Sequence, residues 1–391
     1  MRGYACGVDH ATFLVVAVIV TSLAFDFTNG FHDTANAMAT SIATEALRPR
    51  TAVLISAVLN VVGALLSTEV ARTISGGIVN DGLVTPGMIF AGLIGAILWN
   101  LVTWLLGLPS SSSHALLGGL IGAAWTGAGR HAVHFDQVVA KILVPAVASP
   151  LVAGVAVLLA TRLALRLTAH TPEGAVTRGF RLGQIASASL VALAHGTNDA
   201  QKTMGVITLT LISVGVLGHG AGPPLWVVVT AGLTIGLGTY VGGWRIIRTM
   251  GRGVTALRSL QGFAAETGSA TVILTSAHLG FPLSTTQVCA AGILGTGLAG
   301  RPVRVRWRTV GRMVIAWSVT LPAAAAVGGG AASAVVHGGT LGTVAVVLAA
   351  AALAAVIVIA SRRNPVTADN VNVVPVTAVP ADCPARRSQA P

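Results

Sequence analysis

Two short polar stretches of similar composition interrupt long apolar runs, one in each half of the chain. Residues 29–36 read NGFHDTAN, and residues 195–202 read HGTNDAQK. Each stretch combines a carboxylate, an amide and a histidine with a glycine. Such groups are costly to bury unpaired in hydrocarbon, so their presence inside an apolar run indicates a functional site.

The oxygen atoms of these stretches are of the kind that coordinates a hard cation. They belong to Asp33, Asn36, Asn198 and Asp199. A carboxylate repels an anion unless a cation or proton lies between them, so Asp33 and Asp199 are the predicted coupling-ion sites, with Asn36 and Asn198 contributing oxygens. The alternative is that each acid is neutral or is satisfied by a helix end. Lys202 either pairs with Asp199 or faces an anion, and the sequence leaves both open.

Three further titratable side chains are candidates for moving or holding the coupling ion. Histidine titrates near neutral pH, so His32 and His195 are candidates for a proton relay or for hydrogen bonds to a substrate. Glu266 is the only acid in the middle of its apolar segment, QGFAAETGSA. It is a candidate ion ligand, with helix packing as an equal alternative, and Asn60 is its expected counterpart.

A second pair of matching stretches places hydroxyl groups after a proline. Residues 107–113 read GLPSSSS, and residues 280–286 read GFPLSTT. Proline followed by hydroxyl residues is typical of a helix N-terminus, where free N–H groups and the helix dipole favour an anion. Two such ends would suit a small tetrahedral oxyanion, although the hydroxyls could instead only cap or pack helices. The predicted substrate ligands are Ser110, Ser111, Ser112, Ser113, Ser284, Thr285 and Thr286, assisted by Asn36 and Asn198.

The composition indicates an all-α polytopic membrane protein. Of 391 residues, 53% are hydrophobic and only 9% are charged, against about 25% charged in ordinary soluble domains. The net charge of +12 comes from arginines in short loops between apolar runs, which favours membrane topology over nucleic-acid binding. Three scattered cysteines cannot form a disulfide framework or a metal site, and no cofactor is expected.

Apolar runs long enough to span a bilayer recur along the chain. They lie near 11–30, 51–70, 84–107, 109–129, 141–165, 182–216, 224–244, 257–278, 282–300, 310–330 and 340–361. The long runs that carry the polar stretches are interpreted as helices broken at Gly30 and Gly196. The Pro–Ser/Thr stretches are two further helix breaks, which either span or form re-entrant hairpins.

The pattern predicts an inverted-repeat secondary transporter. Residues 1–165 form the first repeat, 166–181 a basic cytoplasmic connection, 182–330 the second repeat, 331–361 an extra transmembrane helix and 362–391 a disordered tail. An odd number of crossings per half inverts one repeat relative to the other and places the substrate between them at the bilayer midplane. The arginine positions predict an external amino terminus and a cytoplasmic carboxyl terminus.

Four ordered motifs together resemble the inorganic phosphate transporter (Pit) family, in particular its bacterial low-affinity branch. They are NGFHDTANAMATSI, GLPSSSSHALLGG, AHGTNDAQKTMG and GFPLSTTQV. The resemblance implies a phosphate symporter in the bacterial plasma membrane, driven by sodium or protons, that works by alternating access. It also implies that some relatives carry phosphate as a metal complex or carry sulfate. The family's Asn-Asp pair matches Asn198-Asp199, whereas His32 replaces the Asn in the first half.

Two other functions compete with this interpretation. The same fold could carry sulfate, and a membrane-embedded phosphohydrolase could be built on His32-Asp33. No metal-ligand motif supports an enzyme, and catalysis would not require a second, inverted polar stretch. The sequence leaves open whether the protein is a homodimer.

Overall fold

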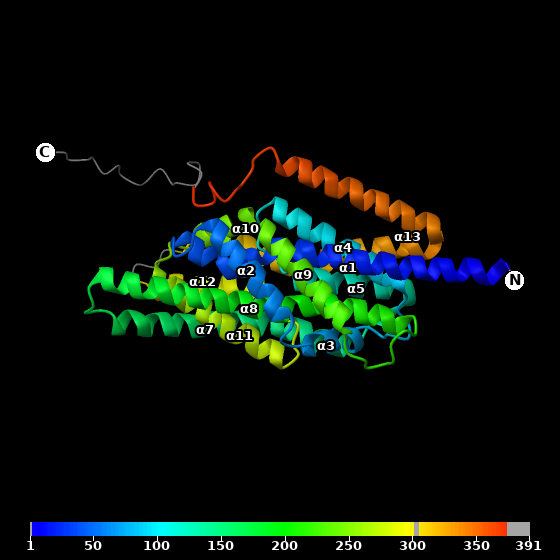
Figure 1. The fold of residues 1–391 in the computed structure, drawn as a ribbon, viewed down its shortest axis with the longest axis horizontal. Helices are drawn as coiled ribbons and strands as arrows, with labels where there is room; N and C mark the ends of the chain where they lie inside the picture. Colours follow the sequence, from blue (N-terminus) through cyan, green and yellow to red (C-terminus); the bar gives the residue numbers. More distant parts are fainter. Residues whose placement is uncertain (1, 301–304, 374–391) are drawn as a thin grey trace.

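A computed structural model describes residues 2–300 and 305–373, with side-chain environments from residue 12 onward. The described chain is a bundle of α-helices without a β-sheet, which confirms the predicted all-α fold class (Figure 1). The α-helices are α1 (Arg2–Ala43), α2 (Pro49–Ala64), α3 (Glu69–Gly77), α4 (Pro86–Leu105), α5 (Ser112–Ala128), α6 (Phe135–Val138), α7 (Val144–Leu167), α8 (Glu173–Ser213), α9 (Leu225–Val241), α10 (Trp244–Arg248), α11 (Ser259–His278), α12 (Thr285–Ala299) and α13 (Trp307–Ser361).

Several helices of the described chain are long and apolar enough to cross a membrane. Four pass by length and hydropathy, namely Thr12–Ala43, Pro86–Leu105, Phe135–Leu167 and Trp307–Ser361. Two bent pairs, α2 with α3 and α9 with α10, raise the number to six if each pair is one span. Fewer helices pass than the eleven predicted runs. Helices α5 and α12 have only 17 and 15 residues, α8 and α11 do not pass, and α13 contains the last two predicted runs in one helix.

The predicted breaks at Gly30 and Gly196 are wrong. Helix α1 continues through Gly30, and α8 continues through Gly196. Both glycines instead mark helix crossings, because a Cβ on Gly30 would collide with the Ile235 carbonyl of α9 and one on Gly196 with the Asn60 carbonyl of α2. Small residues let helix backbones approach closely, and a helix tolerates glycine there.

The crossing of α8 and α2 gives a stability prediction. We expect Gly196→Ala to destabilise the protein by about 1–3 kcal/mol, because the added methyl group overpacks two backbones that cannot separate without moving a helix. Thermal unfolding in detergent, followed by size-exclusion chromatography, measures this effect. Gly174→Ala, also in α8 and facing open space, is the matched control and should leave the unfolding temperature unchanged or raised.

Helices α1 and α8 run antiparallel through the interior and position the polar stretches opposite each other. Near the end of α1, Thr44 donates a hydrogen bond of 2.8 Å to Gln184, near the start of α8. Eleven residues earlier in α1 and eleven residues later in α8, Asp33 meets His195. The antiparallel pairing therefore brings together segments from the two halves of the sequence.

The Pro–Ser/Thr breaks lie inside the bundle. Helix α5 begins where Ser112 donates to Asp33 at 2.6 Å, and α12 begins where Thr285 donates to Asp199 at 3.3 Å. Ser111 and Ser284 cap these helices. Each side chain accepts one hydrogen bond from the backbone N–H of the residue three positions further along the chain. Both helices thus start at the level of the polar stretches, as re-entrant hairpins would.

The carboxyl-terminal region folds back on the bundle. Helix α13 reverses direction at Gly339, whose φ of 53° favours glycine, so that residues 340–361 return alongside the preceding helix (Figure 1). The first part of the tail predicted to be disordered is packed, because Arg248 donates to Asn370 at 2.8 Å and Asn372 donates to the Ile42 carbonyl. Residues 374–391, the rest of that tail, lie outside the described residues.

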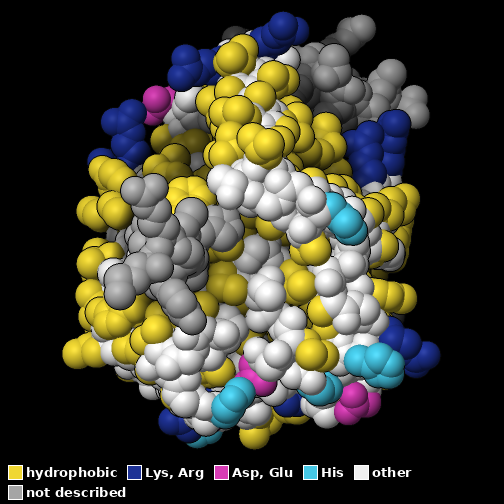
Figure 2. All heavy atoms as spheres, turned by 90° about the vertical axis from the view of Figure 1, so that its right-hand side faces the viewer, with side chains coloured by type: hydrophobic (Ala, Val, Ile, Leu, Met, Phe, Trp, Pro, Cys, Tyr) yellow, Lys and Arg dark blue, Asp and Glu magenta, His cyan; other side chains and the backbone are white. Residues whose placement is uncertain are grey.

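The two ends of the bundle differ in charge. At the end where α1 finishes, Arg181 donates to the Glu45 carbonyl and Arg258 pairs with Glu173 at 3.1 Å. Figure 2 views the opposite end, where α1 begins, and shows histidine and acidic side chains along its lower edge with hydrophobic side chains on its flanks. A basic end and a histidine-containing end agree with the predicted orientation, which stays a prediction.

Candidate functional site

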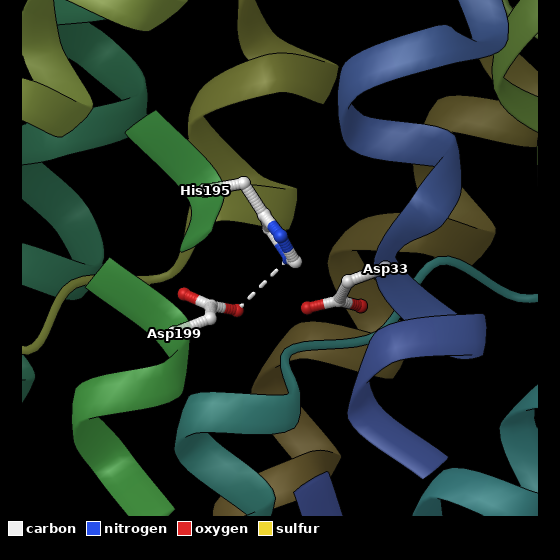
Figure 3. A group of neighbouring side chains, drawn as sticks. All are labelled: Asp33, His195 and Asp199. Carbon is white, nitrogen blue, oxygen red and sulfur yellow. Dashed lines mark ion pairs between the residues drawn. The ribbon is translucent and has the colours of Figure 1, made fainter. Parts of the chain in front are cut away.

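The central cluster joins a carboxylate of α1 to a histidine and a carboxylate of α8. One ligand atom each from Asp33, His195 and Asp199 lies within 4.8 Å of the other two (Figure 3). All three side chains are at most 1% exposed. Such a group can share one cation or one proton, and the structure brings together three residues that the sequence named as candidates.

Asp33 is held by donors from three helices. His32 Nδ1 lies 2.6 Å from its Oδ1, Ser112 of α5 donates to its Oδ2 at 2.6 Å, and Thr286 of α12 donates to its Oδ1 at 3.3 Å. Hydrogen bonds to a carboxylate are among the strong ones in proteins. Asp33 thus ties α1 to the N-termini of both short helices.

His32 connects the central cluster to α4. Its Nε2 lies 3.1 Å from the hydroxyl oxygen of Thr103, which also lies 3.0 Å from the Trp99 carbonyl. Its Nδ1 faces the carboxylate of Asp33. His32 therefore joins Asp33 of α1 to Thr103 of α4 through its two ring nitrogens.

Lys202 pairs with Asp199 and does not face an open anion site. Its Nζ lies 2.5 Å from Asp199 Oδ1, and the lysine is 1% exposed. A buried ammonium is costly unless it is paired, so this contact is required for stability. Of the two roles that the sequence left open for Lys202, the structure shows the ion pair with Asp199. The ammonium group takes the place of a cation at this carboxylate.

His195 presents an incompletely satisfied nitrogen to the cluster. Asn60 donates to Thr239 at 2.7 Å, so its oxygen faces His195 Nδ1 at 3.1 Å and accepts a hydrogen bond from it. The other nitrogen, Nε2, lies 3.2 Å from Asp199 Oδ2 without hydrogen-bond geometry. This buried nitrogen is therefore a candidate for contact with a bound ion or substrate.

The predicted hydroxyl ligands divide into two sets. Ser110, Ser112, Thr285 and Thr286 contact the central carboxylates, His32 or Asn36. Ser111 and Ser284 cap helices, and Ser113 donates to the Leu283 carbonyl across the two breaks. The residue types alone could not separate ligands from caps, because neighbouring residues at a helix start point in different directions.

Two amides at the cluster keep unpaired atoms. Asn36 donates to Thr285 at 3.2 Å and to Thr286 at 3.0 Å, but its oxygen has no partner. Asn198 is 0% exposed and neither of its amide atoms is hydrogen-bonded. Buried polar groups are normally satisfied, so these atoms are candidates for contact with a bound ion or substrate.

Glu266 lies in a separate polar group towards the end of α1. It accepts hydrogen bonds from Thr40, from Ser187 at 2.6 Å and from Gln184 at 3.3 Å. The structure does not bring Glu266 into contact with the carboxylates of the central cluster. Its side chain is well satisfied, so its predicted role as an ion ligand stays a prediction.

Sequence reasoning missed several buried polar residues on the other side of the cluster. Ser22, Asp26 and Asn29 of α1 and Asn100 of α4 are all 0% exposed. The signal was present in α1, because Ser22, Asp26 and Asn29 precede Asp33 at intervals of four, three and four residues. That spacing places them on one helical face, which a search for compact motifs overlooks.

A sequence model of the Phosphate transporter family matches residues 29–328, three quarters of the chain. The chain belongs to this family. A probable low-affinity inorganic phosphate transporter of Mycobacterium tuberculosis is 53% identical over 313 residues, covering 80% of this chain and 75% of the relative. One from Bacillus subtilis is 41% identical over 316 residues, covering 80% and 95%.

A solved structure, titled as the sodium-dependent phosphate transporter, shares the fold. Its TM-score is 0.71 at 23% identity, with 81% of this chain and 98% of that chain covered. The family and the two relatives named above are described as phosphate transporters and not as enzymes, so the phosphohydrolase alternative is rejected. The family match contains the whole central cluster and begins after Asp26.

Proposed function

We propose that the chain is a secondary active symporter that carries inorganic phosphate together with protons or sodium by alternating access. The observation that carries this proposal is the pair of buried carboxylates in the central cluster. Asp33 and Asp199 lie together with His195, and Lys202 pairs with Asp199 alone. The carboxylate of Asp33 is therefore open to a coupling cation or a proton.

A buried site that contains carboxylates couples phosphate to a cation by electrostatics. A phosphate anion that enters it brings uncompensated charge into a region of low dielectric constant, which is strongly unfavourable. A proton on His195 or a cation between Asp33 and Asp199 supplies the missing charge. Phosphate and cation then favour each other's binding, and this reciprocal effect is the requirement for symport.

The surrounding donors suit a tetrahedral oxyanion. Helices α5 and α12 both direct N-termini at the cluster, and each helix dipole contributes about half a positive charge there. Ser112 and Thr286, which donate to Asp33 in this structure, can rotate to donate to phosphate. The antiparallel arrangement of α1 and α8 supports the inverted repeat that alternating access uses.

Phosphate rather than sulfate is the expected substrate, because the site contains carboxylates. At neutral pH phosphate retains at least one O–H group, which can donate to Asp33 or Asp199, whereas sulfate has none. A site built to hydrogen-bond a substrate hydroxyl rejects an analogue without it by up to roughly 10⁴-fold, and we expect at least ~100-fold here.

Competition in proteoliposomes tests this specificity. We expect a tenfold excess of unlabelled phosphate to suppress uptake of labelled phosphate, and the same excess of sulfate to leave it nearly unchanged. Arsenate, which keeps the O–H group and the tetrahedral shape, is the positive control. Equal inhibition by sulfate would reject the hydrogen-bond argument and favour the sulfate alternative.

A further inference from the structure

A stripe of polar side chains follows one face of the second half of α1. Its members are Ser22, Asp26, Asn29, Asp33, Asn36 and Thr40, at intervals of four, three, four, three and four residues. Those intervals keep the side chains on one helical face. The second half of the stripe contacts the central cluster and Glu266, whereas the first half makes no hydrogen bond to either of them.

The first half of the stripe has no hydrogen-bond partners. Both carboxylate oxygens of Asp26, both amide atoms of Asn29 and the hydroxyl of Ser22 are buried and unpaired. Thr203 of α8 lies beside Asp26, and its hydroxyl is likewise without a bond of normal geometry. A single unpaired buried polar atom is uncommon in a folded protein, so such a group of them indicates a place that binds something.

Asn100 of α4 belongs to the same level of the bundle. Helices α1 and α4 both finish at the arginine-containing end, so they run parallel. His32 of α1 contacts Thr103 of α4, and three residues earlier on each helix lie Asn29 and Asn100. Both amide atoms of Asn100 are also unpaired.

We infer that Asp26 is a proton-binding site of the transport cycle, separate from the central cluster and connected to it through Asn29 and Asn100. This inference rests on the proposed symport. Asp26 lies seven residues before Asp33, which is about 10 Å along the helix axis at 1.5 Å per residue. It therefore lies between the phosphate site and the end of the bundle at which α1 begins.

A proton fits this position better than a metal cation. A buried carboxylate must be neutralised, and one proton on one oxygen does so and leaves an O–H that can donate to Thr203. The charged groups that act on Asp26 are Asp199 and Lys202, which already neutralise each other. Helix α4 has no titratable side chain, while α5 offers His114 and α9 only Tyr240, which is 60% exposed.

The proton is expected to move along the amides. Asn29 and Asn100 each offer a donor and an acceptor, so they can orient water between Asp26 and the His32–Asp33 pair. When Asp26 is protonated, the first half of the stripe carries no net charge, and the protein with phosphate bound can change conformation. The proton must then leave Asp26 before the empty protein returns to its starting conformation.

Asp26→Asn tests the inference, because asparagine mimics the protonated acid. In proteoliposomes containing the full-length variant, we expect exchange of labelled for unlabelled phosphate at equal concentrations to persist. Net uptake driven by an inward proton gradient should fall at least tenfold. Acidification of the vesicle interior, read from a trapped pH-sensitive dye, should be lost with it. Asp26→Glu retains a carboxyl group and should keep proton-driven uptake.

A control variant separates a specific effect at Asp26 from a general effect of removing a carboxylate. Asp81→Asn, near the end where α1 begins and paired with His219 on the surface, should behave as the unaltered protein. Wild-type proton-driven uptake by Asp26→Asn, or uptake by the unaltered protein that requires sodium and moves no protons, would overturn the inference. Should Asp26→Asn fail to fold, Asp26→Glu decides: a shift in the pH dependence of its proton-driven uptake relative to the unaltered protein supports the inference, and an unchanged pH dependence would overturn it. Absence of phosphate exchange in the unaltered protein would instead reject the proposed function.

Discussion

Replacing Asp199 by Asn is expected to abolish phosphate uptake and also to destabilise the protein. The substitution leaves the ammonium of Lys202 without its partner at 1% exposure. Breaking a buried ion pair from one side costs about 3–5 kcal/mol. The variant should therefore reach the membrane in smaller amounts, unfold at a lower temperature and show no uptake above background.

A double variant separates stability from transport. In Asp199→Asn with Lys202→Met both charges are removed together, and replacing a buried pair by neutral groups is often neutral for stability. We expect the unfolding temperature to recover while uptake remains absent, because the coupling cation or proton has lost one of its two carboxylates. Labelled phosphate uptake, normalised to the protein in the membrane, measures this. Restored uptake in the double variant would show that the pair is only structural.

Asp33→Asn should have a comparable effect on transport with a smaller effect on stability. With the amide oxygen in the place of Oδ1, it can still accept from His32 and Thr286, and the NH2 group in the place of Oδ2 can donate to the hydroxyl of Ser112. The contacts between α1, α5 and α12 are therefore partly kept. The lost charge removes one of the two carboxylates that attract the coupling cation. We expect uptake to fall about 100-fold, which corresponds to roughly 2.7 kcal/mol.

The matched control for Asp33→Asn is Asp369→Asn. Asp369 forms only an exposed pair with Arg50 at 3.4 Å, and such pairs contribute little to stability. The control should transport as the unaltered protein does. Uptake by Asp33→Asn within a few-fold of that control would remove Asp33 from the coupling site.

The sequence predicted the components of the site better than their geometry. Asp33, His195 and Asp199 were recognisable because charge is rare in apolar runs, and they meet as expected. The roles of Gly30 and Gly196 were misjudged, because a glycine that permits a helix crossing and one that breaks a helix look alike in one dimension. Only the position of the neighbouring backbone distinguishes them.

Local patterns also hid which side chains face the cluster. Ser111 and Ser112 are adjacent and identical in type, yet one caps α5 and the other bonds to Asp33. Asp26 lies in a run that was interpreted as an apolar helix, although its spacing from Asp33 places both on one face of α1. Its lack of hydrogen-bond partners depends on the side chains of α4 and α8, which no local pattern in α1 can predict.

The most direct test of the proposed symport is uptake of labelled phosphate into proteoliposomes with a proton gradient and a sodium gradient imposed separately. We predict that phosphate accumulates above its external concentration when an inward proton gradient is imposed with equal sodium on both sides. Accumulation under a sodium gradient alone would keep the symport and remove the proton site at Asp26. If phosphate accumulates under neither gradient, the claim that the central cluster couples phosphate to a cation is wrong.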